Sequence, residues 1–128
     1  MKGFTLIEVL IVITVIAILL TIAVPSYREH VRASQRFDAT STMLTIAAAQ
    51  EQYRSNNTTY GTLAALGITT TPEGHYTLSV TGNSSTGYTL TARAVGDQVN
   101  DQENGTSCAV LTIVVNGLST TKTPVDCW

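Results

Sequence analysis

The feature that most constrains this chain is an apolar run that begins almost at its first residue. From Phe4 to Val24 there are about 21 residues, and Glu8 is the only ionisable side chain among them. As a helix rising about 1.5 Å per residue, the run spans about 31 Å, enough to cross the hydrocarbon core of a bilayer. An ionised carboxylate costs about 2.5–3.5 kcal/mol near the middle of a membrane. The pattern therefore predicts a membrane-competent helix whose acid needs a partner.

Two other kinds of N-terminal segment share this apolar character. A cleaved secretory signal has a shorter run and a small-residue cleavage site, whereas no Ala-x-Ala site follows this one. A plain membrane anchor accounts for the length but leaves Glu8 unexplained. Lys2 is the only charge before the run, so the positive-inside rule sends the remainder of the chain outward.

The hexapeptide Gly3-Phe4-Thr5-Leu6-Ile7-Glu8 resembles the processing and methylation motif of type IV prepilins. The resemblance implies that residues 1–3 are a leader peptide, although a shorter one than is usual in the family. It implies a prepilin peptidase that cuts between Gly3 and Phe4 and methylates the new amino group of Phe4. It also implies an assembly role for Glu8, because its carboxylate can pair with the Phe4 amine of a neighbouring subunit.

The apolar helix is expected to continue past a proline. Pro25 removes one backbone hydrogen bond and clashes with the preceding turn, so we expect a helix break there, as a kink or as local melting near residues 17–24. Residues 26–54 contain no Gly or Pro and predict further helix. Together the two parts make about 50 residues, or roughly 75 Å of helix. Such a helix is too long for the rest of this chain to cover, so it requires partners.

The second half of the chain carries strand patterns. Apolar and polar residues alternate over residues 75–81, 88–95 and 108–115, with polar turns between them. A short helical turn is expected at residues 62–66. Residues 96–106 are expected to form a polar loop, and residues 118–128 to be irregular.

These elements predict an α+β fold, in which a long N-terminal α-helix packs on a small antiparallel β-sheet of three to four strands. The resemblance to type IV pilins, closest to minor pilins with a C-terminal disulfide loop, extends to residues 76–128. It divides the chain into the leader 1–3, a transmembrane or filament-core helix at 4–25 and a periplasmic or extracellular head at 26–128.

Two cysteines, Cys108 and Cys127, lie near the C-terminus. An even number of cysteines in an exported chain predicts one disulfide, closing the loop 108–127. Two free thiols are the alternative, in a reducing compartment. Metal binding is disfavoured because only His30 and His75 could join the two cysteines, so we expect no metal site and no cofactor.

No pattern typical of an enzyme is present in the sequence. A Gly-rich phosphate loop and a supported Ser-His-Asp arrangement are both missing. Asp97, Asp101 and Glu103 fall in one segment, but their spacing does not match the twelve-residue calcium loop. We expect these three acids to be solvated.

The resemblance implies a structural subunit, major or minor, of a type IV pilus that supports adhesion, twitching motility or DNA uptake. Its partners would be other pilin subunits, the prepilin peptidase and the pilus assembly machinery. The chain would reside in the inner membrane before assembly and in the extracellular fimbrium afterwards.

Two alternatives remain open within this resemblance. The first is a minor pilin acting as a DNA-uptake or adhesion receptor, for which Arg54, Arg93 and Lys122 are the candidate DNA contacts. The second is a pseudopilin of a type II secretion system, which would share residues 3–25. The C-terminal disulfide loop favours a pilus over the second alternative.

Overall fold

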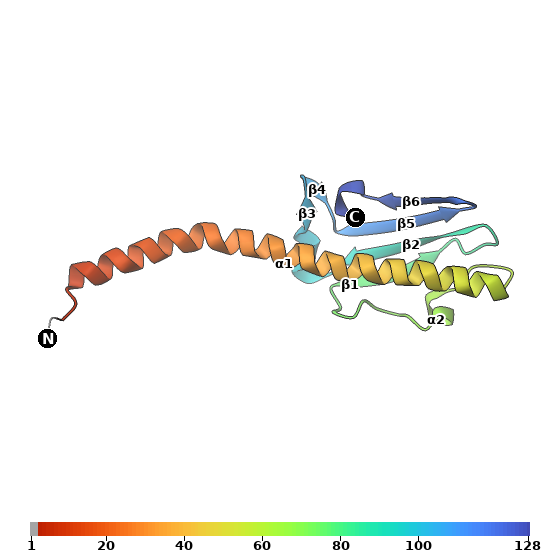
Figure 1. Cartoon of the computed structure of the whole chain (residues 1–128), viewed down its shortest axis with the longest axis horizontal. Helices are drawn as coiled ribbons and strands as arrows, with labels where there is room; N and C mark the ends of the chain where they lie inside the picture. The colour runs from red at the N-terminus through yellow and green to blue at the C-terminus, as the bar shows by residue number, and fades with distance from the viewer. Residues whose placement is uncertain (1–2) are drawn as a thin grey trace. The chain divides into compact units, whose positions relative to one another are not determined.

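A computed structural model of the chain describes residues 3–128 (Figure 1). The chain divides into two compact units, Met1–Val31 and Arg32–Trp128. One helix, α1 (Leu6–Asn56), supplies the helical part of the first unit and the helical layer of the second. The helix expected over residues 26–54 is therefore confirmed, while Met1 and Lys2 of the expected leader lie outside the described residues.

Of the two forms of helix break expected at Pro25, local melting of residues 17–24 is not present among the described residues, and the kink stays a prediction. Helix α1 runs through Pro25 without interruption. Proline removes only one backbone hydrogen bond, and a long helix already nucleated on both sides tolerates that loss. Upstream, the Thr21 hydroxyl donates to the Ile18 carbonyl at 2.6 Å. Melting of residues 17–24 inside a fibre stays a prediction.

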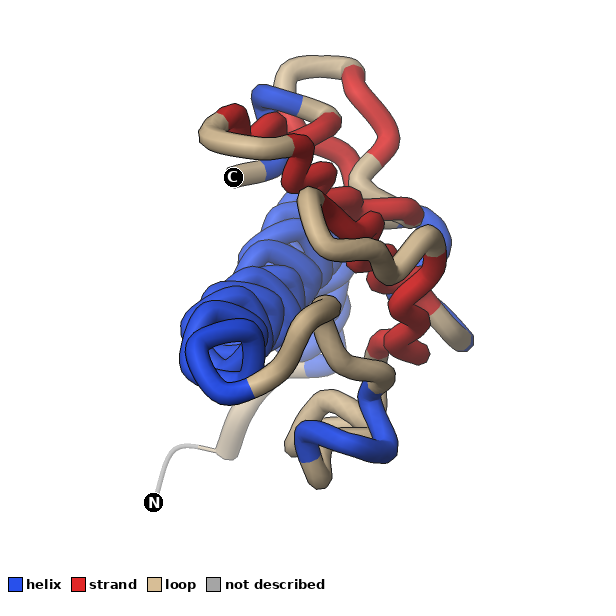
Figure 2. The backbone as a smooth tube through the Cα atoms, turned by 90° about the vertical axis from the view of Figure 1, so that its right-hand side faces the viewer, coloured by secondary structure: helices blue, strands red, loops and turns tan. Residues whose placement is uncertain are grey.

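In the second unit, α1 covers one face of a four-stranded antiparallel sheet (Figures 1 and 2). The helix buries residues spaced three or four apart, which places them on a single face. These are Arg36, Ala39, Met43, Ile46 and Gln50. The sheet meets them with alternate side chains of its strands. These are Tyr76, Tyr88, Leu90, Ala92, Leu111, Ile113 and Val115.

The sheet has the strand order β1-β2-β5-β6, and every neighbouring pair is antiparallel. Its strands are β1 (Tyr76–Thr81), β2 (Gly87–Ala94), β5 (Val110–Asn116) and β6 (Ser119–Thr123). The register places Leu90 beside Ile113 and Ile113 beside Lys122. The three expected strands and the predicted α+β fold are thus confirmed.

The C-terminal segment is not irregular, contrary to our expectation. Strand β6 pairs along β5 after a two-residue turn that starts at Gly117, whose φ is 61°. The short 3-10 helix η2 (Val125–Cys127) follows. The β6 sequence, Ser-Thr-Thr-Lys-Thr, has no apolar alternation, so its strand character depends on pairing with β5.

Residues 96–106 also contain ordered structure where a loop was expected. They form the 3-10 helix η1 (Gly96–Asn100) and a small hairpin of β3 (Gln102–Glu103) and β4 (Thr106–Ser107). Asn104 and Gly105 form the turn, with φ values of 50° and 80°. Such Asn-Gly turns are a strong short-range hairpin signal, which our interpretation of the sequence overlooked.

The connection between α1 and β1 contains α2 (Leu63–Leu66), close to the helical turn expected at residues 62–66. Thr62 caps its start and Gly67 ends it in a left-handed conformation with φ 72°. The buried Gln50 carboxamide fixes the connection to α1. It accepts from the Gly61 N–H at 2.8 Å and donates to the Gly61 carbonyl at 2.7 Å.

Candidate functional site

The first turn of α1 is built by Thr5. Its backbone carbonyl accepts from the N–H groups of Glu8 at 3.2 Å and Val9 at 3.3 Å, and its hydroxyl oxygen accepts from the Glu8 N–H at 3.3 Å. Gly3 and Phe4 precede this cap. The cap starts the helix at Leu6, two residues after Phe4. It places Glu8 where the helix dipole favours a carboxylate.

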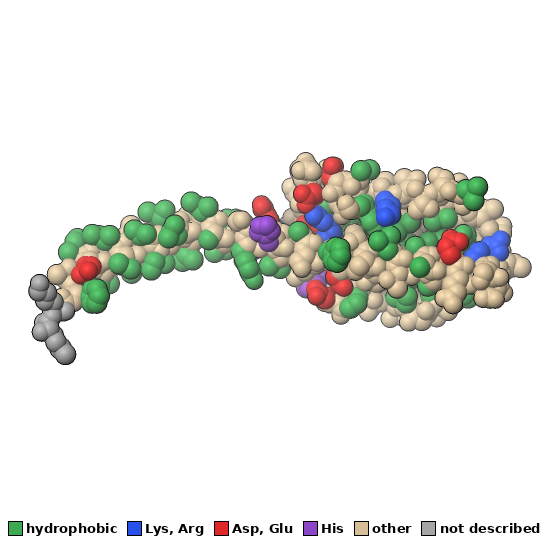
Figure 3. Space-filling view, viewed as in Figure 1, with side chains coloured by type: hydrophobic (Ala, Val, Ile, Leu, Met, Phe, Trp, Pro, Cys, Tyr) green, Lys and Arg blue, Asp and Glu red, His purple; other side chains and the backbone are tan. Residues whose placement is uncertain are grey.

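The apolar part of the first unit has no cover among the described residues. Residues 3–30 are all exposed, and Phe4 exposes 84% of its surface. An 18-residue window within α1 reaches a mean hydropathy of 3.0 with none of it buried, so by length and composition α1 could cross a membrane. Figure 3 shows apolar side chains along this segment. An exposed apolar surface of this extent marks contact with lipid or with other proteins.

Glu8 is the only ionisable side chain between Phe4 and Val24 on this apolar surface. A shallow hollow of about 250 Å³ is lined by apolar atoms of Phe4, Glu8, Val9 and Val12. Within residues 3–128, no side chain pairs with that carboxylate. Phe4 and Glu8, which the motif predicted together as a pair between neighbouring subunits, lie four residues apart in the sequence, and that pairing stays a prediction.

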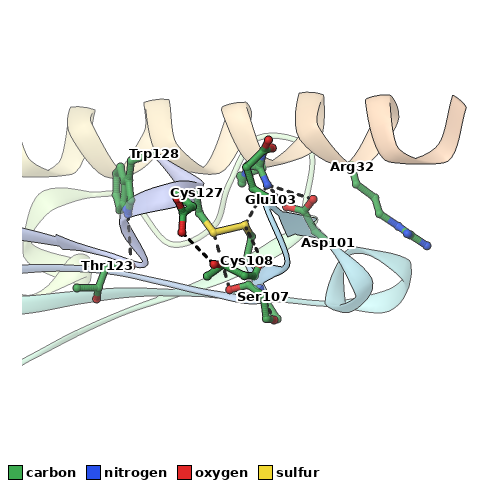
Figure 4. The surroundings of a disulfide bond; sticks show 12 residues. Arg32, Asp101, Glu103, Ser107, Cys108, Thr123, Cys127 and Trp128 are labelled. Atoms are coloured by element: carbon green, nitrogen blue, oxygen red, sulfur yellow. Dashed lines mark hydrogen bonds and ion pairs between the residues drawn. A yellow bond between two sulfur atoms is a disulfide. The ribbon is translucent and has the colours of Figure 1, made fainter. Parts of the chain in front are cut away.

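A second polar cluster joins α1 to the segment before β5 (Figure 4). Arg36 Nη1 lies 3.1 Å from Asp101 Oδ2 and 3.0 Å from Cys108 Sγ, while Arg36 Nη2 pairs with Glu103. Asp101 is only 2% exposed. Burial raises the pKa of the Asp101 carboxyl, and the Arg36 guanidinium opposes that rise.

One turn earlier, Arg32 binds Asp97 with two parallel hydrogen bonds, Nε to Oδ2 and Nη2 to Oδ1, each 3.0 Å long. Between them, the Gln98 amide donates to the Arg32 carbonyl at 2.9 Å and to the Tyr76 hydroxyl at 3.0 Å. The acidic segment is therefore fixed to the helix.

Our expectation that the three acids of this segment are solvated is wrong for Asp101, which is buried against Arg36. Asp97 stays exposed and Glu103 half-exposed, although each is paired with an arginine. Arg32 and Arg36 are four residues apart, which puts them on one side of the helix. That spacing was visible in the sequence. What the sequence did not reveal is that this side of the helix faces the acidic segment.

The predicted disulfide between Cys108 and Cys127 is confirmed, with a sequence separation of 19 (Figure 4). It ties the segment just before β5 to η2. Trp128 follows it, and its Nε1 donates to the Thr123 carbonyl at 3.3 Å. The Nζ of Lys122 lies 5.0 Å from the centroid of the Trp128 ring, which is a cation–π distance.

The three candidate DNA contacts do not form one surface. Arg54 donates to the carbonyls of Ser85 at 3.1 Å and Asn57 at 2.7 Å, bracing the end of α1 against the β1–β2 connection. Arg93 stands opposite Val110, on the sheet face turned away from α1. Lys122 is paired with the buried Ile113 and so faces the helix side.

Comparison with known proteins now decides the family. A model described as "Type IV minor pilin ComP, DNA uptake sequence receptor" matches residues 25–112, and a "Prokaryotic N-terminal methylation motif" matches residues 1–24. The chain belongs to the type IV pilins. This family consists of structural subunits and not of enzymes, which confirms the expectation of a non-enzymatic protein.

Relatives of this pilin include components of several pili. It is 41% identical to the fimbrial protein EcpC of Eikenella corrodens over 62% of this chain and 52% of EcpC. It is 33% identical to the type IV wide pilus major component PilA4 of Thermus thermophilus over 77% of each chain. It is 31% identical to a fimbrial protein of Neisseria meningitidis serogroup B, over 81% of this chain and 61% of that protein. The pilin thus spans about half the length of EcpC.

Proposed function

We propose that this pilin is a structural subunit of a type IV pilus, assembled through the apolar N-terminal part of α1. The observation that carries the proposal is an exposed apolar helical segment whose one acid, Glu8, lies in a first turn capped by Thr5. Processing between Gly3 and Phe4 would create a cationic amine at Phe4. Pilins form pili with other pilin subunits, and the methylation motif implies prepilin processing.

The physical reason for assembly is compensation of charge in a dry environment. The Glu8 carboxylate and the Phe4 amine are each expensive in hydrocarbon, and removing one member of a buried pair costs about 3–5 kcal/mol. When copies pack side by side, the carboxylate of one can meet the amine of the next. The same helix holds the subunit in the inner membrane before assembly and in the extracellular fibre afterwards. The prepilin peptidase and the assembly machinery act in between.

The decisive experiment removes the charge of Glu8 and keeps its shape. We expect Glu8→Gln, expressed as the only copy, to stay in the membrane while its amount in sheared fibres falls more than about tenfold, since the lost pairing exceeds 1.4 kcal/mol. Glu29→Gln is the matched control, because Glu29 is an exposed acid on the same helix. Normal entry of the Glu8→Gln variant into fibres would contradict the proposal, as would a native fibre protein that keeps Met1 to Gly3.

A second candidate function is DNA binding at the head, favoured by the description of the family model that matches residues 25–112. The relatives are named as fimbrial and pilus proteins, which favours a pilus subunit over a pseudopilin of a secretion system. The candidate cations Arg54, Arg93 and Lys122 do not form one surface, so DNA would have to bind each of them at a separate place. Binding that depends on phosphates should weaken steeply as salt rises.

The test is a gel shift with the full chain in detergent at low and high salt. We expect Arg93→Gln to weaken binding more than Arg54→Gln, because Arg54 is occupied by two backbone carbonyls. An absence of any shift at low salt would remove the DNA-binding role and leave the pilus role intact.

A further inference from the structure

The two outer edges of the sheet differ, because the β1 edge is partly covered by the preceding segment and the β6 edge is not. Beside β1, the preceding segment forms a bridge between Thr70 and Thr77, and the Thr71 hydroxyl bonds to the backbone of Tyr76 on both its N–H and its carbonyl. Beside β6, no strand of residues 3–128 lies further out, as Figure 1 shows. An uncovered edge presents backbone donors and acceptors to any extended segment.

The turn fixes which groups of β6 point outward. Asn116 and Ser119 flank a two-residue turn, so they form a hydrogen-bonded pair, and bonding then alternates along the strand. Ser119, Thr121 and Thr123 direct their N–H and C=O groups toward β5. Thr120 and Lys122 direct theirs toward the open edge.

The usual protections of an edge strand are missing or turned aside on β6. The strand contains no proline, no acid and one charge, Lys122. The ammonium of Lys122 is held over the Trp128 ring on the helix side of the sheet. It therefore does not guard the edge, while Ser119, Thr120 and Thr121 are all exposed.

We propose that β6 pairs antiparallel with β6 of a second copy of this chain, about a two-fold axis at Thr121. In this register Thr120 of each copy lies opposite Lys122 of the other, and both pairs exchange two backbone hydrogen bonds. A contact of this kind is isologous, since the same residues serve both copies.

The two neighbouring registers of the β6–β6 pair are less favourable than the one centred on Thr121. A shift toward the C-terminus puts Lys122 opposite Lys122 of the second copy and sets Pro124, which has no N–H, opposite Thr120. A shift toward the N-terminus pairs Lys122 with Leu118, which belongs to the turn. Only the axis at Thr121 lets both outward-facing residues bond without opposing like charges.

The partner is thus a second copy in another fibre or in the membrane before assembly. Subunits within one fibre follow each other by a screw operation, and a two-fold contact cannot come from that operation alone. Between two fibres, many such weak contacts would act together. The contact would then draw fibres into bundles.

The test uses single cysteines in the full chain, oxidised in membranes and in sheared fibres. At the axis, Thr121 and Thr121 of the second copy form a non-hydrogen-bonded pair with Cα atoms about 4.5 Å apart, within reach of a disulfide. We expect Thr121→Cys to shift to twice the monomer mass on a non-reducing gel. Ser119→Cys and Thr123→Cys should each stay monomeric, because each is displaced from its own copy by about 13 Å.

A mixture of the Ser119→Cys and Thr123→Cys chains should form the heterodimer, since these two positions face each other in the proposed register. All three positions are exposed, so random collision would cross-link them equally. Equal dimer at all three positions, or none at position 121, would overturn the proposal.

A backbone test complements the cysteine scan. Thr120→Pro in the Thr121→Cys background removes one outward N–H and spares the bonds to β5, so dimer should be lost. Thr120→Val keeps that N–H and should keep the dimer, and retention of dimer by the proline variant would count against the pairing. The inference is separable from the pilus role, because a dimer found in membranes with no chain in fibres would refute the pilus role alone.

Discussion

Replacement of Arg36 by methionine tests how the acidic segment is held to α1. The side chain of Arg36 is 10% exposed and that of Asp101 is 2% exposed, so Arg36→Met leaves a buried carboxylate without its partner. Removing one member of a buried pair costs about 3–5 kcal/mol. For a head of this size, each kcal/mol lowers Tm by about 4–8 °C, so we expect a fall of at least about 12 °C.

The stability lost in the Arg36→Met variant should be larger at neutral pH than in acid. Burial already raises the pKa of Asp101, and loss of the guanidinium removes the main opposing influence. A carboxyl with a raised folded-state pKa binds its proton more tightly when folded, so folded stability falls as pH rises from the ordinary carboxyl pKa to the raised one. The variant should therefore lose most at neutral pH and recover part of the loss in acid, where Asp101 is protonated.

The assay is thermal and denaturant unfolding of the oxidised full chain, followed by the fluorescence of Trp128, the only tryptophan. Arg36→Met combined with Asp101→Leu is the matched control, because it removes the charge pair and keeps apolar volume. We expect it to recover most of the stability, since apolar replacements of buried ion pairs are often neutral or stabilising. A loss below about 1 kcal/mol for the single variant, or a double variant no better than the single, would refute the reasoning.

Four further outcomes are expected from the same unfolding assay. Gln50→Leu leaves the buried N–H of Gly61 unpaired and should cost about 1–3 kcal/mol, and a change within error would show that water replaces the bond. Tyr88→Phe removes a buried hydroxyl that has no partner among the described residues and should not destabilise. Burial raises the pKa of Tyr88 to about 12, so the wild type should also lose folding stability between about pH 10 and 12. Tyr88→Phe should reduce this alkaline loss. An equal loss in the variant would show that Tyr88 is not its cause. Replacing Cys108 and Cys127 together by serine opens a loop of 19 residues and should cost about 3 kcal/mol, and an unchanged midpoint would show that the unfolded chain gains little freedom.

Much of this pilin could be predicted from local patterns. The apolar run with Glu8, the cysteine pair and the alternation in β1, β2 and β5 each depend on residues close in sequence. They led to the helix, the disulfide, the α+β fold and the family. Each signal is a period or a motif, and such signals survive without knowledge of what packs against them.

The tertiary structure alone decided the rest. Residues 97–103 look like a solvated loop until α1 brings Arg32 and Arg36 against them, across more than sixty residues of sequence. Strand β6 has no apolar period and exists because β5 lies beside it, and the continuity of α1 through Pro25 reflects the cooperativity of the whole helix. These features depend on contacts between distant residues or on the helix as a whole, and no short stretch of sequence encodes either.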